Sequence, residues 1–368
     1  MKHLIIICNL ESLRYEQLKT SSSRYELSLA LDLSKKIERV SIVSPKAECE
    51  SDFDNIALYR CKNSDLQYRI TNIKKHVKKL IKSEDKTVIL FWGYNPLLIG
   101  ALSCLKNENV RITSMVYDTH LAELSSKTQF SKFKIKMFYG IGMRMASCLD
   151  GLLLFKRNAE RYFNPKLRKC FILPTVDTLH NGVAPSSCSD RITFLYAGTL
   201  CDYNGIRQLL SAFSKTTRID MRLRIFGDGP LTCEVLEASQ KDGRIYYGGR
   251  VFNAALKEEI ARADYLLNLR DLSSVANDFG FPSKILEYFE AKKPVISTMV
   301  SDEADFEKAV FLVESVNETD VFKMLMHVAE NREEAIEKVN NAIQYANTHH
   351  NKGVISAKII DFFFNQLF

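Results

Sequence analysis

The residues best suited to chemistry lie in one stretch, residues 279–297, with the sequence FGFPSKILEYFEAKKPVIS. Pro282 suits the first position of a helix, and Gly280 before it permits backbone angles that other residues avoid. A helix that begins there points unpaired N–H groups and a positive dipole end at whatever lies in front, which suits a phosphate. Lys284 adds a cation in the first turn, where a lysine is unfavourable unless an anion is nearby. The stretch therefore predicts an anion site; an ordinary helix with a proline start is the simpler alternative.

The same stretch positions a carboxylate beside the cation. Glu287 lies three residues after Lys284 and four after Ser283, so these side chains share one face of the predicted helix. The other face is apolar and should dock on a sheet. After the helix, residues 294–297 (PVIS) have the short, β-branched character of a central parallel strand.

Length and composition indicate a soluble globular protein of two domains. A chain of 368 residues is too long for one typical core, and 46% apolar with 26% charged residues is an ordinary composition. No apolar run reaches the roughly 18 residues that a membrane span requires. The N-terminus, MKHLIIICNLE, lacks the features of a signal peptide and is expected to form the first strand.

Cysteine spacing and net charge limit which cofactors and partners are expected. The nine cysteines include no C-x-x-C pair, which predicts reduced thiols in a cytoplasm and no metal or catalytic cysteine. The net charge of +7 can serve nucleotide phosphates, an anionic membrane surface or solubility alone. No basic tail or RNA-binding aromatic signature accompanies the charge, so no nucleic-acid partner is expected.

Apolar runs alternate with helical patterns along the whole chain, which predicts parallel α/β sheets. The expected strands before residue 175 are HLIIIC, RVSIVS, TVILFW, RITSMVY, GLLLF and CFILP. A polar, turn-rich linker follows, and the second set is ITFLYAG, MRLRIFG, RIYYGG, DYLLNLR, PVIS and AVFLVE. Two such halves, with ligands at the carboxyl ends of their strands, imply a cleft between them.

The central motif resembles the donor site of GT4-like retaining glycosyltransferases, which have the GT-B fold. In many bacterial members an arginine ends a strand, and a loop then leads into F-P-S-K-x-x-E-Y and G-K-P-V-I. Here Arg270 ends LLNLR, FPSKILEY follows, and AKKPVIS closes the unit. The resemblance implies two Rossmann-like domains facing across a cleft: an acceptor domain (1–178, plus a returning C-terminal helix, 354–368) and a nucleotide-sugar donor domain (190–353).

The resemblance also assigns roles to single residues. Of two family glutamates eight positions apart, Glu287 fits the second, which contacts the ribose. The first position, which contacts the donor sugar, holds Phe279, with Asp278 beside it as a substitute. Gly198 and Thr199 end a strand where the backbone can approach a diphosphate.

The sequence also departs from the family pattern at residue 204. The family's usual lysine is replaced there by Asn204, so more of the positive charge falls to Arg270 and Lys284. Similar D-x-H segments in the family place a histidine near the donor sugar, which here is His120. An ordinary solvated loop histidine is the alternative. The expected catalytic residues are His120, Arg270 and Lys284, and the expected donor-binding residues are Gly198, Thr199, Pro282, Ser283, Glu287 and Asp278; no metal ligand is expected.

The function that this resemblance implies is retaining, metal-independent sugar transfer from a UDP- or GDP-linked donor, without a separate cofactor. The expected acceptor is a glycan or lipid-linked sugar in polysaccharide biosynthesis. A basic, aromatic stretch from Phe130 to Arg144 predicts peripheral contact with an anionic membrane on its cytoplasmic face; a solvated helix is the alternative. A GT-B-like sugar-nucleotide epimerase and a non-catalytic sugar-nucleotide-binding partner of another transferase are the alternative functions.

Overall fold

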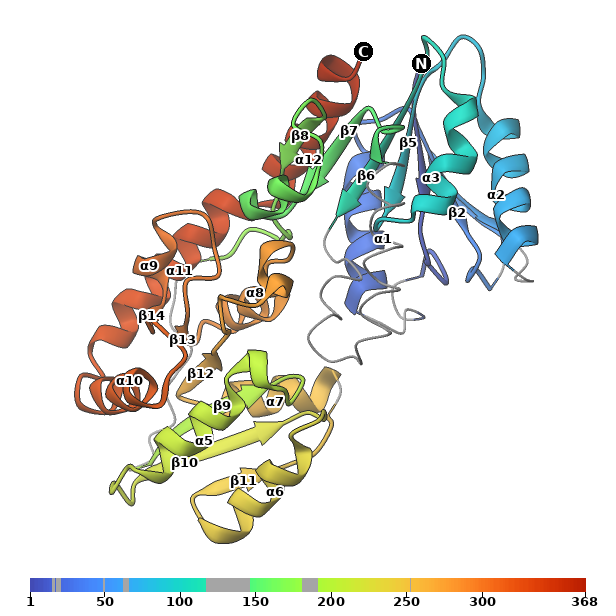
Figure 1. Ribbon diagram of the computed structural model, residues 1–368. Coiled ribbons are helices and arrows are strands. Elements are labelled where there is room, and N and C mark those ends of the chain that lie inside the picture. The colour runs from blue at the N-terminus through green and yellow to red at the C-terminus, as the bar shows by residue number, and fades with distance from the viewer. Residues whose placement is uncertain are drawn as a thin grey trace. The chain divides into compact units, whose positions relative to one another are not determined.

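The computed structural model describes residues 1–14, 17, 21–48, 50–61, 66–116, 146–180, 191–251 and 253–368 (Figure 1). The chain divides into two compact units. The first contains Met1–Thr175, Asp278–Gly280 and His350–Phe368, and the second contains Val176–Asn277 and Phe281–His349. Each unit is built around one sheet whose strands alternate with helices along the chain. The predicted α/β class is therefore confirmed.

The sheet of the first unit has eight strands in the order β3-β4-β2-β1-β5-β6-β7-β8, and only the β3–β4 pair is antiparallel. The strands are β1 (Lys2–Ile7), β2 (Arg39–Ser44), β3 (Ser51–Phe53), β4 (Ile56–Arg60), β5 (Lys86–Trp92), β6 (Val110–Val116), β7 (Gly151–Leu154) and β8 (Arg168–Phe171). Strands β3 and β4 were not predicted. In β4 only Ile56 and Leu58 are buried, so this strand lacks the continuous burial of the central strands.

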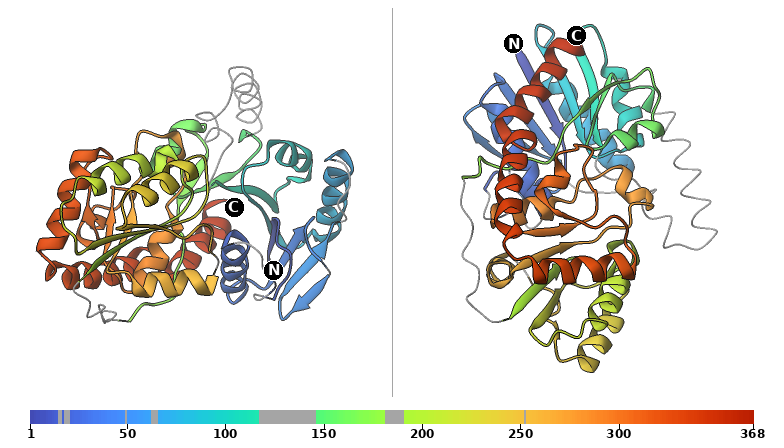
Figure 2. Two further views of the ribbon diagram at one scale, coloured as in Figure 1. Left: turned by 90° about the horizontal axis from the view of Figure 1, so that it is seen from below. Right: turned by 90° about the vertical axis from the view of Figure 1, so that its left-hand side faces the viewer.

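Helices cover both faces of this sheet. Helix α1 (Ser21–Ser34) lies beside α12 (Lys352–Asp361) on one face, and α2 (Leu66–Leu80) lies beside α3 (Pro96–Leu102) on the other (Figure 2). Short 3₁₀ turns occupy Ser103–Leu105 (η2) and Arg157–Tyr162 (η4). The terminal helix, expected over 354–367, begins two residues earlier and ends in a π-helical turn, η7 (Phe362–Gln366).

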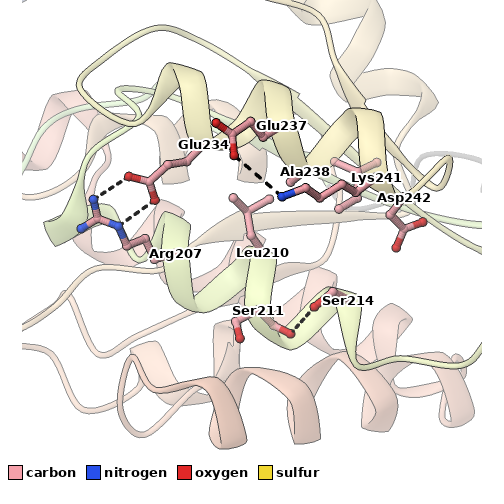
Figure 3. Close-up of a pocket in the computed structure, with 10 residues that line it drawn as sticks. Arg207, Leu210, Ser211, Ser214, Glu234, Glu237, Ala238, Lys241 and Asp242 are labelled. Carbon is pink, nitrogen blue, oxygen red and sulfur yellow. Dashed lines mark hydrogen bonds and ion pairs between the residues drawn. The ribbon is translucent and has the colours of Figure 1, made fainter.

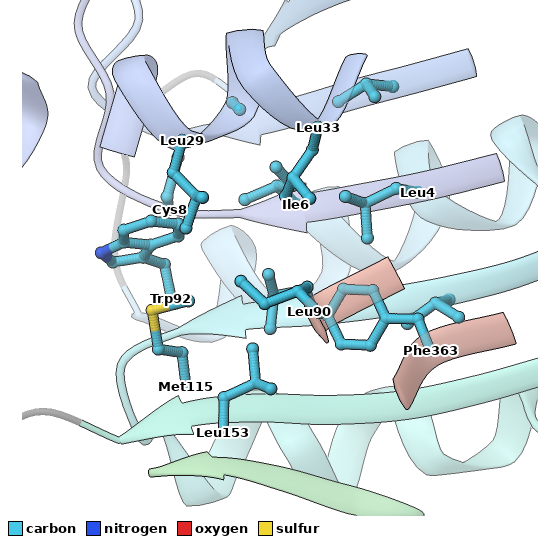
Figure 4. Packing of buried hydrophobic residues seen from close by; sticks show 14 of the residues in the cluster. Leu4, Ile6, Cys8, Leu29, Leu33, Leu90, Trp92, Met115, Leu153 and Phe363 are labelled. Carbon is cyan, nitrogen blue, oxygen red and sulfur yellow. The ribbon is translucent and has the colours of Figure 1, made fainter. Parts of the chain in front are cut away.

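The core under α1 and α12 joins both ends of the chain. Leu4 of β1, Leu33 of α1, Leu90 of β5 and Phe363 of η7 are all fully buried in one cluster (Figure 4). The Lys36 Nζ atom donates to Ser356 Oγ at 3.0 Å, which links the end of α1 to α12. The C-terminal segment therefore completes the core of the first unit.

The second unit has a six-stranded parallel sheet in the order β11-β10-β9-β12-β13-β14. Its strands are β9 (Ile192–Ala197), β10 (Met221–Phe226), β11 (Ile245–Tyr247), β12 (Tyr265–Asn268), β13 (Val295–Ser297) and β14 (Phe311–Leu312). Its helices are α5 (Ile206–Ser214), α6 (Thr232–Lys241), α7 (Asn253–Arg262), α8 (Ser283–Glu290), α9 (Phe306–Ala309), α10 (Glu318–Glu330) and α11 (Glu334–His349), with 3₁₀ turns η5 (Asp202–Asn204) and η6 (Val275–Asp278). Helix α5 packs beside α10, and α11 packs beside α8 and α9.

None of the helices in the described ranges has both the length and the apolar character needed to cross a bilayer. That finding concerns these helices alone.

The aromatic end of the chain should be necessary for the stability of the first unit. Truncating Phe363, which is fully buried, to alanine should lower the free energy of unfolding by about 3–5 kcal/mol, because it removes buried area and leaves a cavity. Val354→Ala on the same helical segment is the control, since Val354 is 53% exposed. Urea unfolding measures both variants, and equal stability of the two would contradict the packing described.

Candidate functional site

Helix α8 begins at Ser283, one residue later than expected. Pro282 precedes the helix in an extended conformation (φ −70°, ψ 102°) and is not its first residue, as the sequence suggested. The predicted apolar stripe is confirmed, since Ile285, Leu286 and Phe289 are buried. Ser283 and Glu287 are exposed on the other face, and Lys284 is half-buried between them.

Lys284 is fixed against the end of strand β9. Its Nζ atom donates a hydrogen bond to the carbonyl oxygen of Ala197, the last residue of that strand. Burial lowers the pKa of Lys284, although the negative charge of Glu287 opposes the shift, and the positive charge of Arg270 adds to it. The ammonium group is thus held in place while its charged form is poorly solvated, so an anionic ligand would stabilise that form.

Gly198 follows Ala197 and keeps the space around this ammonium open. A Cβ atom at residue 198 would lie 2.8 Å from the Tyr196 hydroxyl and 3.1 Å from Lys284 Nζ. Gly227, after β10, adopts φ +135°, and a Cβ atom there would lie 1.8 Å from the Gly198 carbonyl oxygen. Only glycine allows this backbone approach, so the loops after β9 and β10 are both shaped by the absence of side chains.

Thr199 supplies a backbone carbonyl that fixes the loop after β9. The carbonyl accepts hydrogen bonds from the Tyr196 hydroxyl at 2.9 Å and from Asn204 Nδ2 at 2.8 Å. Asn204, which stands where the family pattern has lysine, therefore binds the protein's own backbone. Its amide adds no positive charge to this loop.

Arg270 lies two residues beyond the end of β12, whereas the sequence suggested that it ends the strand. Thr298 holds its main chain: the Arg270 N–H donates to Thr298 Oγ1 at 3.2 Å, and that hydroxyl donates to the Arg270 carbonyl at 3.0 Å. Burial lowers the pKa of the guanidinium, which the phenolic groups of Tyr203 and Tyr196 partly oppose. Its Nε atom is buried and has no hydrogen-bond partner in the described part of the chain.

The second unit thus brings most of the predicted residues to one end of its sheet. Gly198 and Thr199 follow β9, Arg270 follows β12, and Lys284 reaches β9 from the first turn of α8. Pro282 and Ser283 lie at the N-terminus of α8, and Glu287 lies about one turn further along the helix. Two cations, a glycine loop and a helix N-terminus together can bind the charged oxygens of a phosphate or diphosphate. The sequence analysis did not identify Tyr196 or Tyr203, because a tyrosine outside a recognisable motif does not indicate a binding site.

Asp278 has a different environment from the one expected. It belongs to the first unit, where its Oδ2 atom accepts hydrogen bonds from the Tyr162 hydroxyl at 2.7 Å and from Arg161. The Tyr162 ring also lies 4.9 Å from the ring of Phe279. Protein donors therefore already engage the carboxylate that was expected to replace the missing glutamate. Those donors lie 116 and 117 residues earlier in the chain, so no local pattern could reveal them.

His120 and the stretch from Phe130 to Arg144 lie outside the described residues. Their predicted roles remain predictions.

A separate groove opens between α5 and α6 of the second unit, with a volume of about 430 Å³ (Figure 3). Four of its charged side chains form two pairs: Arg207 Nη2 lies 2.6 Å from Glu234 Oε1, and Lys241 Nζ lies 3.8 Å from Glu237 Oε2. Neither Lys284 nor Arg270 lines it. The groove is therefore not the anion site.

The sequence that contains this site also matches a known family model. Residues 191–331 match the family model described as "Glycosyl transferases group 1", and this stretch contains Gly198, Arg270 and the whole of α8. No curated protein sequence matches the chain.

Several solved structures resemble the whole chain, and three of them illustrate the likeness. Sucrose-phosphate synthase from Thermosynechococcus elongatus has a TM-score of 0.72 at 11% identity, covering 100% of this chain and 99% of that one. A structure described as trehalose-6-phosphate from E. coli bound with UDP-2-fluoro glucose has a TM-score of 0.72 at 10% identity, covering 98% of each chain. WaaG, a glycosyltransferase involved in lipopolysaccharide biosynthesis, has a TM-score of 0.63 at 12% identity, covering 98% of this chain and 99% of that one. At these identities the likeness concerns the fold, and it confirms that the chain has the GT-B fold.

Proposed function

We propose that the protein is a GT4-type retaining glycosyltransferase that moves a sugar from a UDP- or GDP-linked donor to an acceptor. The observation that carries the proposal is the pair of part-buried cations, Lys284 and Arg270, at the strand ends of the second unit. Burial disfavours the charge of both groups. A diphosphate would neutralise them and accept charge-assisted hydrogen bonds from both.

In this mechanism the protein mainly stabilises the leaving group. As the bond from the anomeric carbon to the diphosphate breaks, positive character develops on the sugar and negative charge on the diphosphate oxygens. Cations that are already held in place stabilise that charge without reorganising. The Ala197 carbonyl holds Lys284, and Thr298 holds the main chain of Arg270. We propose that these groups act without a metal ion, and that His120 lies near the donor sugar.

The remaining donor contacts follow from helix α8 and the loop after β9. Glu287 is exposed one turn after Lys284, where its carboxylate can accept hydrogen bonds from both ribose hydroxyls. Ser283 and the backbone at Gly198 and Thr199 would lie along the diphosphate. This assignment explains why a carboxylate is found so close to an anion site.

A non-catalytic sugar-nucleotide-binding protein is the second candidate, and one specific observation favours it. Phe279 replaces the family's first acid, and the neighbouring Asp278 is engaged by Arg161 and Tyr162. A protein with these features could bind a nucleotide sugar without transferring it. Turnover distinguishes the two candidates.

The test is a panel of UDP- and GDP-linked sugars, with thermal shift measuring binding and release of nucleoside diphosphate measuring turnover. One donor should raise the Tm and be consumed. NMR of the product should show that the anomeric configuration of the donor is retained, and a metal chelator should not lower the rate. Glu287→Gln should weaken nucleoside diphosphate binding by about 1.5–3 kcal/mol, because the ribose loses a charged acceptor. Glu290→Gln, at the exposed end of the same helix, should bind normally. Binding without turnover would support the non-catalytic candidate, and absence of binding would exclude both.

The two cations can be tested separately from catalysis. Lys284→Ala and Arg270→Ala should each weaken UDP or GDP binding by about 1.5–3 kcal/mol, the usual effect of losing a charge-assisted bond. Neither should lower the free energy of unfolding, because each removes a cation whose burial is unfavourable. Lys257→Ala, on the exposed face of α7, is the control. Unchanged affinity in both variants would refute the anion site.

The lowered pKa of Lys284 gives the same prediction a pH dependence. As the pH rises through that pKa, Lys284 loses its proton and nucleotide affinity should fall, at a lower pH than for an exposed lysine. The sign for stability is opposite: the unfolded chain binds this proton more tightly, so the Lys284 contribution to unfolding free energy rises with pH across that interval. Calorimetric titration from neutral to alkaline pH should show the affinity loss in the wild type and none in Lys284→Ala.

We also propose that the acceptor is a glycan or lipid-linked sugar at the cytoplasmic face of a membrane. The net charge of +7 and the basic stretch from Phe130 to Arg144 motivate this, since each basic residue near an anionic surface contributes about 1 kcal/mol. Vesicles of anionic lipid should sediment the protein at low salt and release it at high salt, whereas neutral vesicles should not bind it.

A matched pair of variants locates the contact. Glutamine at Lys132, Lys134, Lys136 and Arg144 should abolish sedimentation. Glutamine at the four α2 lysines, Lys74, Lys75, Lys78 and Lys79, should not, although it removes the same charge. Equal losses would mean that only net charge matters, and sedimentation with neutral lipid would contradict the electrostatic account.

A further inference from the structure

The carboxyl end of β1 in the first unit holds acidic side chains that the donor site does not use. Glu11, in the loop after β1, is 7% exposed, and Glu26, in α1, is 6% exposed. Glutamates are rarely so buried, because a carboxylate removed from water is unfavourable unless other groups neutralise it. The burial of Glu11 in particular requires an explanation.

Glu11 has a fixed backbone and an unsatisfied side chain. Its carbonyl oxygen accepts a hydrogen bond from the Glu48 N–H at 3.0 Å, which anchors the loop. Its Oε2 atom is buried, and among the residues that the structure describes no donor reaches it. A buried acceptor without a partner is the kind of group that a ligand can satisfy.

Both carboxylates lie near enough to Cys8 to influence its thiol. This thiol follows β1 directly, and its pKa is raised first by burial, then by the charge of Glu26 and, more weakly, by Glu11. Glu26 also forms a side-chain hydrogen bond with the thiol. Both carboxylates therefore act on the same sulfur atom from the loop and from α1.

Two aromatic residues lie beside them. Trp92 ends β5, the neighbour of β1, and its ring meets the ring of Tyr25 edge-on with centroids 5.5 Å apart. The Tyr25 hydroxyl is buried and, like Glu11 Oε2, has no hydrogen-bond partner in the described ranges. Figure 4 shows the indole nitrogen of Trp92 on the side away from Leu90 and the other core leucines. Ligands of parallel α/β sheets bind at this end of the strands.

We propose that Glu11, Glu26, Tyr25 and Trp92 form an acceptor subsite, and that the acceptor sugar carries a protonated amine. A sugar hydroxyl could donate to Glu11 Oε2, but it would add no positive charge, and none of the described residues forms an ion pair with Glu11. An ammonium group supplies both the hydrogen bond and the charge. The indole and phenol rings suit a sugar ring and attract a nearby cation. The inference rests on the proposed function only in treating the bound sugar as an acceptor.

The test is direct binding of D-glucosamine to the full chain without nucleotide, at slightly acidic pH so that the amine is protonated. Ligand-observed NMR titration should give saturable binding, about tenfold or more tighter than for D-glucose or N-acetyl-D-glucosamine. Glu11→Gln and Tyr25→Phe should each weaken glucosamine binding by about tenfold. Glu84→Gln, an exposed glutamate before β5, should not change it.

A purely structural role for Glu11 predicts a different result. If its charge only supports the N-terminus of α1, Glu11→Gln should lower the Tm and leave glucosamine binding unchanged, which would overturn the inference. The subsite predicts an equal or higher Tm, since an unsatisfied buried charge is removed. Equal affinity for glucosamine and glucose, or no saturable glucosamine binding, would also overturn it. UDP affinity serves as the separate readout: Glu11→Gln should retain it, and a wild type that binds glucosamine but no nucleotide refutes the proposed function alone.

Discussion

The candidate site of the second unit depends on the burial of two cations at the ends of parallel strands. Burial lowers the pKa of both Lys284 and Arg270, and the Nε atom of Arg270 finds no partner in the described chain. A folded protein gains nothing from such groups by itself, because removing a cation from water is unfavourable unless an anion compensates. Their position is explained when a ligand supplies that anion.

The surrounding backbone is adapted to the same requirement. Gly198 leaves room beside the Lys284 ammonium, and Gly227 adopts φ +135° so that its backbone can pass the Gly198 carbonyl. Asn204 and Tyr196 both bind the Thr199 carbonyl, which keeps the loop after β9 in one conformation. A ligand would then meet cations and N–H groups that are already oriented, and electrostatic stabilisation of a leaving group requires that preorganisation.

Sequence reasoning was strongest where one local pattern determines the structure. The run RVSIVS coincides with β2, and the apolar stripe of α8 is buried as expected, because a continuous apolar run or a helical stripe must face a core. It was weaker at boundaries: Pro282 precedes its helix and Arg270 lies two residues beyond its strand. It could not reveal contacts between distant segments. Lys284 meets Ala197 across 87 residues, and Asp278 meets Tyr162 across 116, distances at which no motif carries information about pairing.

The two units hold unsatisfied charge of opposite sign. In the second unit Arg270 is a buried cation without a hydrogen bond to Nε, and in the first unit Glu11 is a buried carboxylate without a donor to Oε2. If the proposed ligands bind there, each would supply the opposite charge, and binding would then be linked to folding stability at both places. Under the proposed function, an anionic diphosphate would match Arg270 and Lys284 and be repelled by Glu11. A cationic acceptor would have the reverse preference. Neither substrate would then bind well in the place of the other, although each unit places its charged residues at the carboxyl ends of parallel strands.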